Sequence, residues 1–348
     1  MQETTLFGGL LSNSAGRRLG QMVDGFLATQ VVAVTARLGV PDHLAGTAQT
    51  AEELATATNT DPDALGRLLR AAALFGLLVQ DENGQFALTE MGDLLRSDAP
   101  GSMRDLAVGF TGPPIWRSVG QLSDIVRTGR PENYGDEGGV IWDYYQHHPD
   151  EAQWIARAMG TITSRLATEV SESYDPSGFE RIVDVGGGQG TLLMHLLRNA
   201  PHATGVLFDL SEALSSAPAI LADGGVADRT EIVAGSFFQE IPADGDLYLI
   251  SQVLHNWDDE RARTIVSNCH KVSRPGSTLL VIEPILPSGP QPSPLHLLDL
   301  IALVCAGSRE RTREQLEALL TSESYTLIRD IPLSQDFLPW HILECRRI

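Results

Sequence analysis

Three glycines at alternate positions close a short apolar run in this chain. The segment 181–190 reads RIVDVGGGQG, and the apolar, helix-forming residues 191–197 follow directly. This order predicts a strand, a tight turn and a helix N-terminus, an arrangement in which backbone can closely approach a bound nucleotide. A second apolar run, 206–210, carries Asp209 about 20 residues beyond the glycines, where doubly wound sheets place a carboxylate against ribose hydroxyls. We therefore expect an adenosine-type ligand in the C-terminal half.

The glycine spacing alone leaves alternatives open. Gly186, Gly188 and Gly190 form a G-x-G-x-G pattern, whereas a dinucleotide-binding loop has G-x-G-x-x-G. Asp184 also stands where dinucleotide loops usually carry an apolar residue, so a nicotinamide dehydrogenase is disfavoured. The structural alternative is a turn that serves only strand-to-helix packing, and the position of Asp209 argues against it.

Two later segments contain further polar groups that could do chemistry. Residues 235–242 read GSFFQEIP, and residues 249–260 read LISQVLHNWDDE. His255 follows an expected buried strand and precedes an acidic helix start, which places it at the carboxyl end of the strand, where open α/β sheets bind ligands. A lone histidine more often has a structural role, so its position alone does not make it catalytic.

Together with segments 184–190 and 208–210, these residues resemble the small-molecule O-methyltransferases that use S-adenosylmethionine. The most similar group is the two-domain, dimeric kind found in plant phenolic metabolism and bacterial antibiotic pathways. Residues 307–314, GSRERTRE, match the late motif of that family. The resemblance implies a Rossmann-like doubly wound sheet, S-adenosylmethionine as cofactor and a homodimer. It also implies methyl transfer to a hydroxyl, phenolic by expectation, of a small aromatic or polyketide-type secondary metabolite, without naming the acceptor.

The resemblance assigns cofactor-binding roles residue by residue. Gly186 and Gly188 would let the methionine part of the cofactor lie against backbone, and Asp209 would accept hydrogen bonds from both ribose hydroxyls. Phe237 would stack on adenine. Alternatively, Phe237 and Phe238 are core aromatics at a strand end, where adjacent residues point to opposite faces.

The chain departs from the family pattern at three positions. Ser236 stands where an acid commonly holds the adenine amino group, and Ser251 stands where plant members have a lysine near the cofactor. Asn256 replaces an acid after the histidine. Because serine still forms hydrogen bonds, we expect rearranged cofactor contacts, with Gln252 sharing the role of Ser251. Asn256 leaves open a different reaction on the same scaffold, hydroxylation or decarboxylation.

The family pattern makes His255 the expected general base, with Glu283 and Glu310 as its catalytic partners. A phenol has a pKa of about 10, and an imidazole with a pKa of about 6.5 can take its proton as attack begins. Either glutamate could fix the tautomer of His255 and stabilise the imidazolium. For Glu310 the alternative is a surface ion pair with a neighbouring arginine.

The acceptor pocket is expected under a helical connector. Met159 matches a family position that contacts the substrate, and Trp116, Trp142 and Asn256 are further candidates. Aromatic residues at helical spacing belong more often to a core, which is the alternative for the tryptophans.

Three segments would position these groups. Residues 1–100 read as short helices, one of them at 30–39, followed by a hairpin around Asn83 and Gly84, which is a winged-helix-like pattern. Residues 101–177 read as a helical connector. In residues 178–348 we expect strands at 181–185, 204–209, 230–234, 246–251, 277–283, 325–330 and 341–347, and helices at 190–199, 211–223, 258–273 and 312–321. This alternation predicts a parallel, doubly wound sheet. A winged-helix regulator that senses a metabolite is the alternative from another class. The candidate recognition helix at 61–76 is poor in basic residues, so we favour a dimerisation role.

The composition limits the class of protein further. The 348 residues carry a net charge of −20, which argues against nucleic acid or an anionic membrane as partner. No uninterrupted apolar run approaches the ~18 residues of a membrane helix, and the N-terminus does not read as a secretory signal. Cys269, Cys305 and Cys345 show no CxxC spacing. We therefore expect reduced thiols, no metal site and a cytoplasmic protein.

Overall fold

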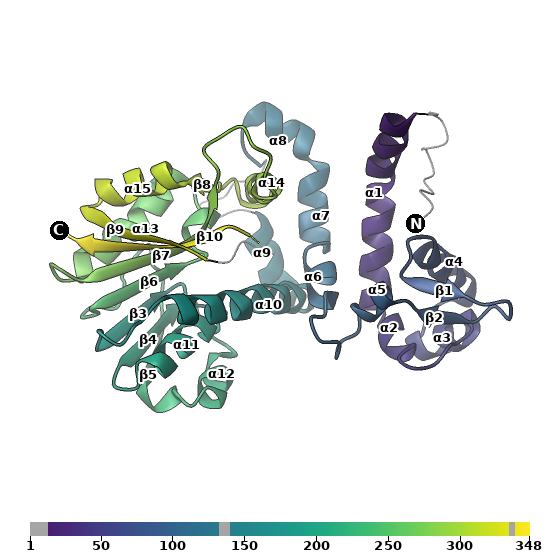
Figure 1. Cartoon of the computed structure of the whole chain (residues 1–348), viewed down its shortest axis with the longest axis horizontal. Coiled ribbons are helices and arrows are strands. Elements are labelled where there is room, and N and C mark those ends of the chain that lie inside the picture. Colours follow the sequence, from purple (N-terminus) through teal and green to yellow (C-terminus); the bar gives the residue numbers. More distant parts are fainter. Residues whose placement is uncertain (1–12, 132–139, 334–337) are drawn as a thin grey trace. The chain divides into compact units, whose positions relative to one another are not determined.

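The computed structural model describes residues 13–131, 140–333 and 338–348 (Figure 1). The chain divides into two compact units, Met1–Pro113 with His148–Thr161 and Pro114–His147 with Ile162–Ile348. Helix α10 (Pro149–Ser173) contributes residues to both. The segment 101–177, expected to be a separate connector, is therefore shared between the two units.

Short helices and one hairpin build the first unit. Its helices are α1 (Ser14–Arg37), α2 (Val40–His43), α3 (Ala51–Thr58), α4 (Pro62–Leu74), α5 (Glu90–Asp93) and α6 (Arg104–Gly109). Strands β1 (Leu78–Gln80) and β2 (Phe86–Leu88) pair antiparallel, as expected, and Gly84 between them has a φ of +80°. Helix α4 starts where Asp61 accepts the N–H of Ala64 and where the ring of Pro62 fits the first turn.

Helix α1 is longer than the sequence pattern indicated. The helix expected at 30–39 is the C-terminal part of 24 helical residues, and Val31 and Ala36 there are buried in the apolar core of the unit. Further toward the N-terminus lies a row of exposed apolar side chains at helical spacing, which we call the α1 stripe: Leu19, Met22, Val23, Phe26 and Leu27.

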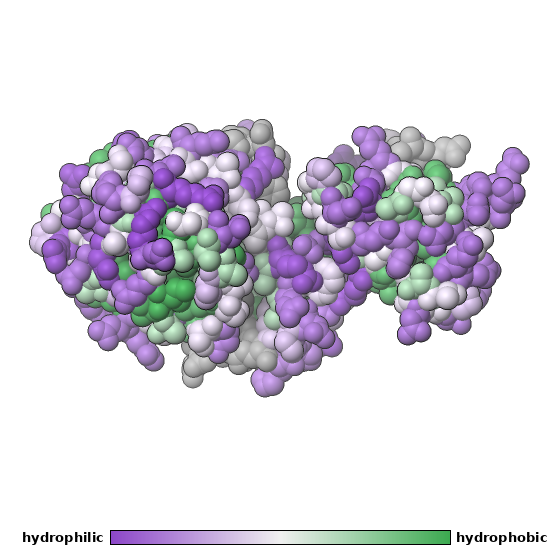
Figure 2. All heavy atoms as spheres, turned by 90° about the horizontal axis from the view of Figure 1, so that it is seen from below, coloured by the Kyte–Doolittle hydropathy of each residue, from purple (hydrophilic) through white to green (hydrophobic). Residues whose placement is uncertain are grey.

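Within the described residues, α1 is also the one helix whose length and apolar composition would suffice to cross a membrane. A search for uninterrupted apolar runs missed this helix, because charged residues such as Arg17 and Asp24 interrupt it. Since its C-terminal end packs into a core, α1 fits a core helix as well. On the face drawn in Figure 2, hydrophilic side chains cover most of the surface, and apolar side chains gather in smaller areas.

The second unit is built on a twisted sheet with the strand order β5-β4-β3-β6-β7-β10-β9. Five strands are parallel and lie within a few residues of their expected positions: β3 (Arg181–Val185), β4 (Thr204–Asp209), β5 (Thr230–Ala234), β6 (Leu247–Ser251) and β7 (Thr278–Leu286). The winding reverses between β3 and β6, which are neighbours. Ligands bind at the carboxyl ends of strands at such a reversal, and the loops after these two strands carry the glycines and His255.

The sheet is mixed, which corrects the expectation of a wholly parallel one. Strand β10 (Trp340–Arg347) is antiparallel to both β7 and β9 (Tyr325–Pro332). Only residues 333–339 separate β9 from β10 in sequence, too few for the crossover of a dozen or more residues that parallel neighbours need. The chain therefore turns back on itself, and the last strand is inserted beside β7.

Helices cover both faces of the sheet (Figure 1). One apolar core joins the sheet to the C-terminal part of α10, to α11 (Thr191–Asn199) and to α12 (Ala217–Asp223). The other joins it to α13 (Asp259–Val272) and α15 (Arg313–Ser322). Helix α12 was expected to start at 211 but starts at Ala217, because Pro218 fits only the first turn of a helix. The remaining helices are α7 (Pro113–Gly120), α8 (Leu122–Thr128), α9 (Val140–His147) and α14 (Leu295–Ala306).

Candidate active site

The glycine loop after β3 has a backbone that other residues would not fit. Gly186 has a φ of +74°, and a Cβ on it would lie 2.7 Å from Cγ2 of Val253 and 3.6 Å from the ring of Phe237. Gly188 has a φ of +55°, and the place of its missing Cβ has no described atom within 4 Å. The loop is thus closed on the side of Val253 and open at Gly188, where a ligand can lie directly against backbone.

Two carboxyl groups lie behind this loop. Asp209, at the end of β4, accepts the N–H of Gly188 at 2.8 Å and the N–H of Leu210 at 2.7 Å, and burial raises its pKa. Asp184 in β3 is buried, and burial together with the charge of Asp209 raises the pKa of Asp184 to about 7. Oδ2 of Asp184 has no hydrogen-bond partner among the described residues. This surplus of acceptors suits a ligand rich in hydroxyl and ammonium donors.

Phe237 and Ser236 lie in the turn after β5 and not on a strand. The ring of Phe237 adjoins Gly186 and packs edge-on against Phe238 and Trp257, with centroids 4.9 and 6.0 Å away. Because β5 ends at Ala234, the expectation that the two phenylalanines point to opposite faces of a strand does not apply. The hydroxyl of Ser236 accepts the N–H of Phe238 at 3.3 Å.

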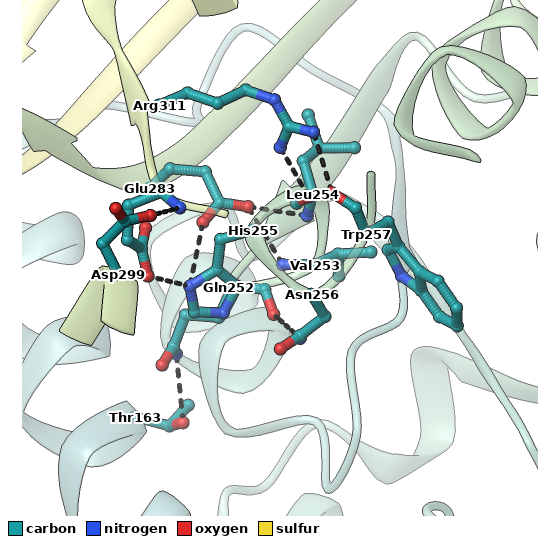
Figure 3. A network of polar contacts seen from close by, with 11 residues as sticks. Thr163, Gln252, Val253, Leu254, His255, Asn256, Trp257, Glu283, Asp299 and Arg311 are labelled. Atoms are coloured by element: carbon teal, nitrogen blue, oxygen red, sulfur yellow. Dashed lines mark hydrogen bonds and ion pairs between the residues drawn. The ribbon is translucent and has the colours of Figure 1, made fainter. Parts of the chain in front are cut away.

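His255 lies in a 3₁₀ turn, η3 (Leu254–Asn256), that follows β6 (Figure 3). Glu283 on β7 holds the start of this turn, because its Oε1 accepts the N–H groups of Val253 at 3.0 Å and Leu254 at 2.8 Å. Arg311 holds the turn from the other side by donating to the carbonyls of Leu254 at 2.7 Å and Trp257 at 2.8 Å. The backbone around the histidine is thus fixed by two buried side chains.

Both glutamates expected beside His255 are found there. Nδ1 of His255 lies 2.9 Å from Oε1 of Glu310 and 3.8 Å from Oε2 of Glu283. Both glutamates are only 2% exposed, so Glu310 is not part of a surface ion pair. The N–H of Glu310 is itself held at 2.8 Å by Asp299 on α14. Strand β8 (Arg311–Thr312), paired with β7, brings the late motif to this place.

The charges of this cluster determine the protonation of the histidine. Burial alone would lower the pKa of His255, but the charges of Glu283 and Glu310 and the hydrogen bond to Glu310 raise it to about 9. The backbone carbonyl of Gln252 acts in the same direction. Burial, reinforced by the charge of Glu310, raises the pKa of Glu283. His255 is therefore mostly an imidazolium at neutral pH when no ligand is bound.

Gln252 and Asn256 have partners other than those expected from the sequence. The residue before the turn, Gln252, has a φ of +58°, uncommon outside glycine. Its side chain donates to the hydroxyl of Thr163 on α10 at 3.2 Å, and its carbonyl accepts the Asn256 amide at 3.0 Å. In contrast, the buried hydroxyl of Ser251 has no partner in the described part of the chain. Ser251 thus has hydrogen-bonding capacity left for a ligand.

The expected acceptor-binding residues belong to both compact units. Met159 is half-buried in the first unit, Trp116 on α7 is 38% exposed, and the side chain of Trp142 on α9 lies outside the described residues. Their roles stay predictions. Trp154, by contrast, packs against the core of the first unit with the Arg157 guanidinium 4.1 Å from its ring, as an ordinary core aromatic would.

Sequence reasoning missed Arg311, Asp299 and Thr163. The late motif contains several arginines, and all of them were treated as candidate ion partners of Glu310. In the structure both Arg309 and Arg311 pair with Asp259, but only Arg311 is buried, at 3% exposure, and also binds backbone carbonyls. Nothing in the local sequence distinguishes the buried arginine from the exposed ones.

The fold and site define a class I methyltransferase, and comparison with known proteins agrees. Residues 119–326 match the model of the O-methyltransferase domain, and residues 21–98 match the O-methyltransferase dimerisation domain. The chain belongs to this family and is an S-adenosylmethionine-dependent O-methyltransferase. The match at 21–98 favours the dimerisation role of the winged-helix-like segment over a regulatory one.

Individual relatives extend along nearly the whole chain. The phenazine O-methyltransferase PhzM from Lysobacter antibioticus is 36% identical over 328 residues, which are 94% of this chain and 95% of that protein. The aclacinomycin 10-hydroxylase RdmB from Streptomyces purpurascens is 33% identical over 340 residues, 93% of this chain and 87% of that protein.

A solved structure adds ligands to the comparison. The O-methyltransferase NcsB1 from neocarzinostatin biosynthesis, in complex with S-adenosylmethionine and 2-hydroxy-5-methyl naphthoic acid, superposes with a TM-score of 0.79 at 31% identity. The match covers 92% of this chain and 96% of that one.

The open side of the glycine loop can be tested with Gly188→Ala. The added methyl group would occupy the space in which a ligand lies against backbone, and we expect calorimetry to show S-adenosylmethionine binding weakened by about 1–3 kcal/mol, roughly 5- to 150-fold. Gly276→Ala is the matched control. Gly276 also has a positive φ, +85°, and open space around it. It lies just before β7, at the amino ends of the parallel strands, whereas the glycine loop lies at their carboxyl ends. Equal losses in the two variants would mean that the loop is only a turn.

Proposed function

We propose that His255 is the general base for methyl transfer to a phenolic hydroxyl, and that Glu283 and Glu310 position and charge-stabilise it. The contact of Nδ1 with two buried carboxylates carries this proposal. It fixes the plane of the ring and favours a proton on Nδ1, so that a neutral ring presents the lone pair of Nε2 to an acceptor. After proton transfer the same carboxylates stabilise the imidazolium.

The residues around the glycine loop would hold the cofactor. S-adenosylmethionine, when bound, supplies a methyl group already activated by its sulfonium. Asp209 retains lone pairs for ribose hydroxyls, Phe237 offers a ring beside the loop, and Gly186 and Gly188 let backbone approach. The hydroxyl of Ser251, which has no partner among the described residues, is proposed to bind the cofactor. Ser236 accepts a backbone N–H and thus has its own donor free for adenine. Gln252 is oriented by its bond to Thr163 and keeps its amide oxygen for a donor of the cofactor.

The acceptor is proposed to be a small aromatic or polyketide-type secondary metabolite. The activities of the relatives support this class, because PhzM acts on a phenazine and NcsB1 binds a hydroxylated naphthoic acid. Met159, Trp116, Trp142 and Asn256 remain the proposed acceptor contacts. Alignment of the hydroxyl with the methyl group is the remaining task of this pocket.

A second candidate reaction is hydroxylation or decarboxylation on the same scaffold. Similarity to RdmB favours it, as does Asn256 in place of the usual acid. The product mass separates the reactions, since methyl transfer adds CH₂, hydroxylation adds oxygen and decarboxylation removes carbon dioxide.

His255→Asn is expected to lower kcat by about 10²–10⁴-fold, the usual contribution of general acid–base catalysis. The affinity for S-adenosylmethionine should stay within about twofold, because His255 lies in a different loop from the glycines. His341→Asn, which also breaks a histidine–carboxylate pair (Nδ1 to Asp330 Oδ1, 2.6 Å), is the control. A parallel loss of kcat and cofactor affinity in His255→Asn would show that His255 is structural.

The pH dependence of kcat/KM reports the charge of His255. Because the carboxylates raise the pKa of His255 to about 9, the base is protonated below that value, and kcat/KM should rise with pH up to about 9. Glu310→Gln removes one negative charge, lowers the pKa of His255 and should shift this limb to lower pH. The pH profile of kcat/KM should be measured with two acceptors whose hydroxyl groups have different pKa values. This comparison separates ionisation of the substrate from ionisation of the enzyme. If the rising part of the profile shifts only with the pKa of the acceptor, His255 is not the group that titrates, and its assignment as the base is contradicted.

We further propose that the chain forms a homodimer through the α1 stripe. Five exposed apolar side chains on one helix face support this interface, and four of them (all but Leu19) lie inside the segment that matches a dimerisation domain. Phe26→Glu places a charge in the stripe, and sedimentation velocity should then find monomers where the wild type is a dimer. Ile328→Glu, at a comparably exposed site on β9, is the control and should stay dimeric. An unchanged dimer in Phe26→Glu would place the interface elsewhere.

A further inference from the structure

The cluster of His255, Glu283 and Glu310 has the composition of a metal site. It is the one group of three or more histidine, cysteine or acidic side chains, among the described residues, whose donor atoms all lie within 4.8 Å of one another. The sequence predicted no metal site because its cysteines lack ligand spacing. These three ligands are far apart in sequence, and only the neighbouring strands β6, β7 and β8 bring them together.

Two oxygens of this cluster lack partners. Oε2 of Glu283 and Oε2 of Glu310 are buried and accept no hydrogen bond from any described residue. Their other oxygens are used, by the N–H groups of Val253 and Leu254 for Glu283 and by His255 for Glu310. A buried carboxylate oxygen without a donor is costly, and a cation bound by the two carboxylates would offset this cost.

The distances suit a small tetrahedral ion. Zinc bonds of about 2.1 Å to nitrogen and carboxylate oxygen place neighbouring ligand atoms roughly 3.4 Å apart in a tetrahedron. Nδ1 of His255 lies 2.9 Å from Oε1 of Glu310 and 3.8 Å from Oε2 of Glu283. The first distance is somewhat shorter and the second somewhat longer than this ligand-to-ligand distance. The third distance, between the oxygens of the two glutamates, is no longer than 4.8 Å, so the three donor atoms surround a space of about the size that the ion needs.

We propose that His255, Glu283 and Glu310 bind Zn²⁺, or a first-row divalent ion of similar preference, and that the ion reversibly inhibits methyl transfer. The inhibitory part rests on the proposed role of His255 as general base. An ion on Nδ1 occupies the lone pair of that nitrogen, so the proton of a neutral ring resides on Nε2. The nitrogen that would take the proton of the acceptor is then already protonated, and the base is lost while the cofactor site is unchanged.

The donor set also predicts selectivity. One imidazole nitrogen with two carboxylates suits Zn²⁺, whereas Mg²⁺ and Ca²⁺ prefer six or more oxygen ligands. Arg311, the nearest buried cation, does not occupy the site, because its donors bind the carbonyls of Leu254 and Trp257 and the carboxylate of Asp259. We therefore expect zinc to inhibit at concentrations at which magnesium has no effect.

The test begins with zinc binding by the full-length protein saturated with S-adenosylmethionine. Competition with a chromogenic zinc indicator should give one ion per chain, and rate assays should show inhibition with the same midpoint, reversed by EDTA. Glu310→Gln and His255→Asn should each weaken zinc binding by at least about 10-fold. His341→Asn, which breaks a histidine–carboxylate pair with one acid only, should leave it unchanged. Glu283→Gln keeps an oxygen for the N–H groups of Val253 and Leu254 and serves if another variant fails to fold.

The outcomes separate this proposal from the assignment of the base. Absence of saturable zinc binding, or binding that persists at full strength in Glu310→Gln and His255→Asn, overturns the metal site. If zinc binding depends on these residues but turnover does not depend on His255, the metal site is supported. The assignment of His255 as the general base is then overturned. Inhibition by zinc that is accompanied by loss of S-adenosylmethionine affinity overturns the stated mode of inhibition.

Discussion

The bonds of one carboxylate determine where the chemistry of this protein takes place. Glu283 sits in the middle of the sheet and uses one oxygen to hold the N–H groups of Val253 and Leu254. The backbone must therefore turn directly after β6, and this turn aims the ring of His255 back toward the second oxygen of the same glutamate. The pairing of Ser251 with Ile282 across β6 and β7 sets that alignment. A one-residue slip between these strands would move Glu283 to the opposite face and dissolve the site.

Burial of two carboxylates next to one histidine is an expensive arrangement. An acid removed from water is stabilised only by close donors or cations, and such groups rarely add net stability. The cluster balances part of this cost with backbone N–H groups, with the imidazolium and with the Asp299 bond to the backbone of Glu310. Arg311 adds positive charge while its donors are directed to carbonyls. The cluster thus serves to shift the pKa of His255 and contributes little to the free energy of folding.

Much of the fold could be predicted from the sequence, because its signals are local. Apolar runs bounded by glycine and polar residues indicated β3 to β7, and Asp61 with Pro62 indicated the start of α4. The direction of β10 was not local information, since it depends on which edge of the sheet the last hairpin joins. The start of α12 could have been corrected from Pro218 alone.

The site was predicted unevenly for the same reason. Gly186, Gly188 and Asp209 follow from spacing within a strand-turn-helix unit. The contacts of Glu283 and Glu310 with His255 join residues far apart in sequence, and the family resemblance indicated them where spacing could not. Arg311 illustrates the limit, because one arginine in a run of charged residues is buried only through the pairing of β8 with β7.

The division of the chain has a consequence for its synthesis. The core of the first unit needs residues from α10, since Trp154 packs against it and Ala158 lies under Gly109, whose missing Cβ would be 2.9 Å from that alanine. When the ribosome has made residue 113, this unit still lacks the piece that closes it, and it waits until Thr161 has emerged from the exit tunnel. By then residues 114–147, which belong to the other unit, are already outside and have nothing to pack on. The nascent chain therefore exposes apolar surface of both units at once, a state in which chaperones would be expected to engage it.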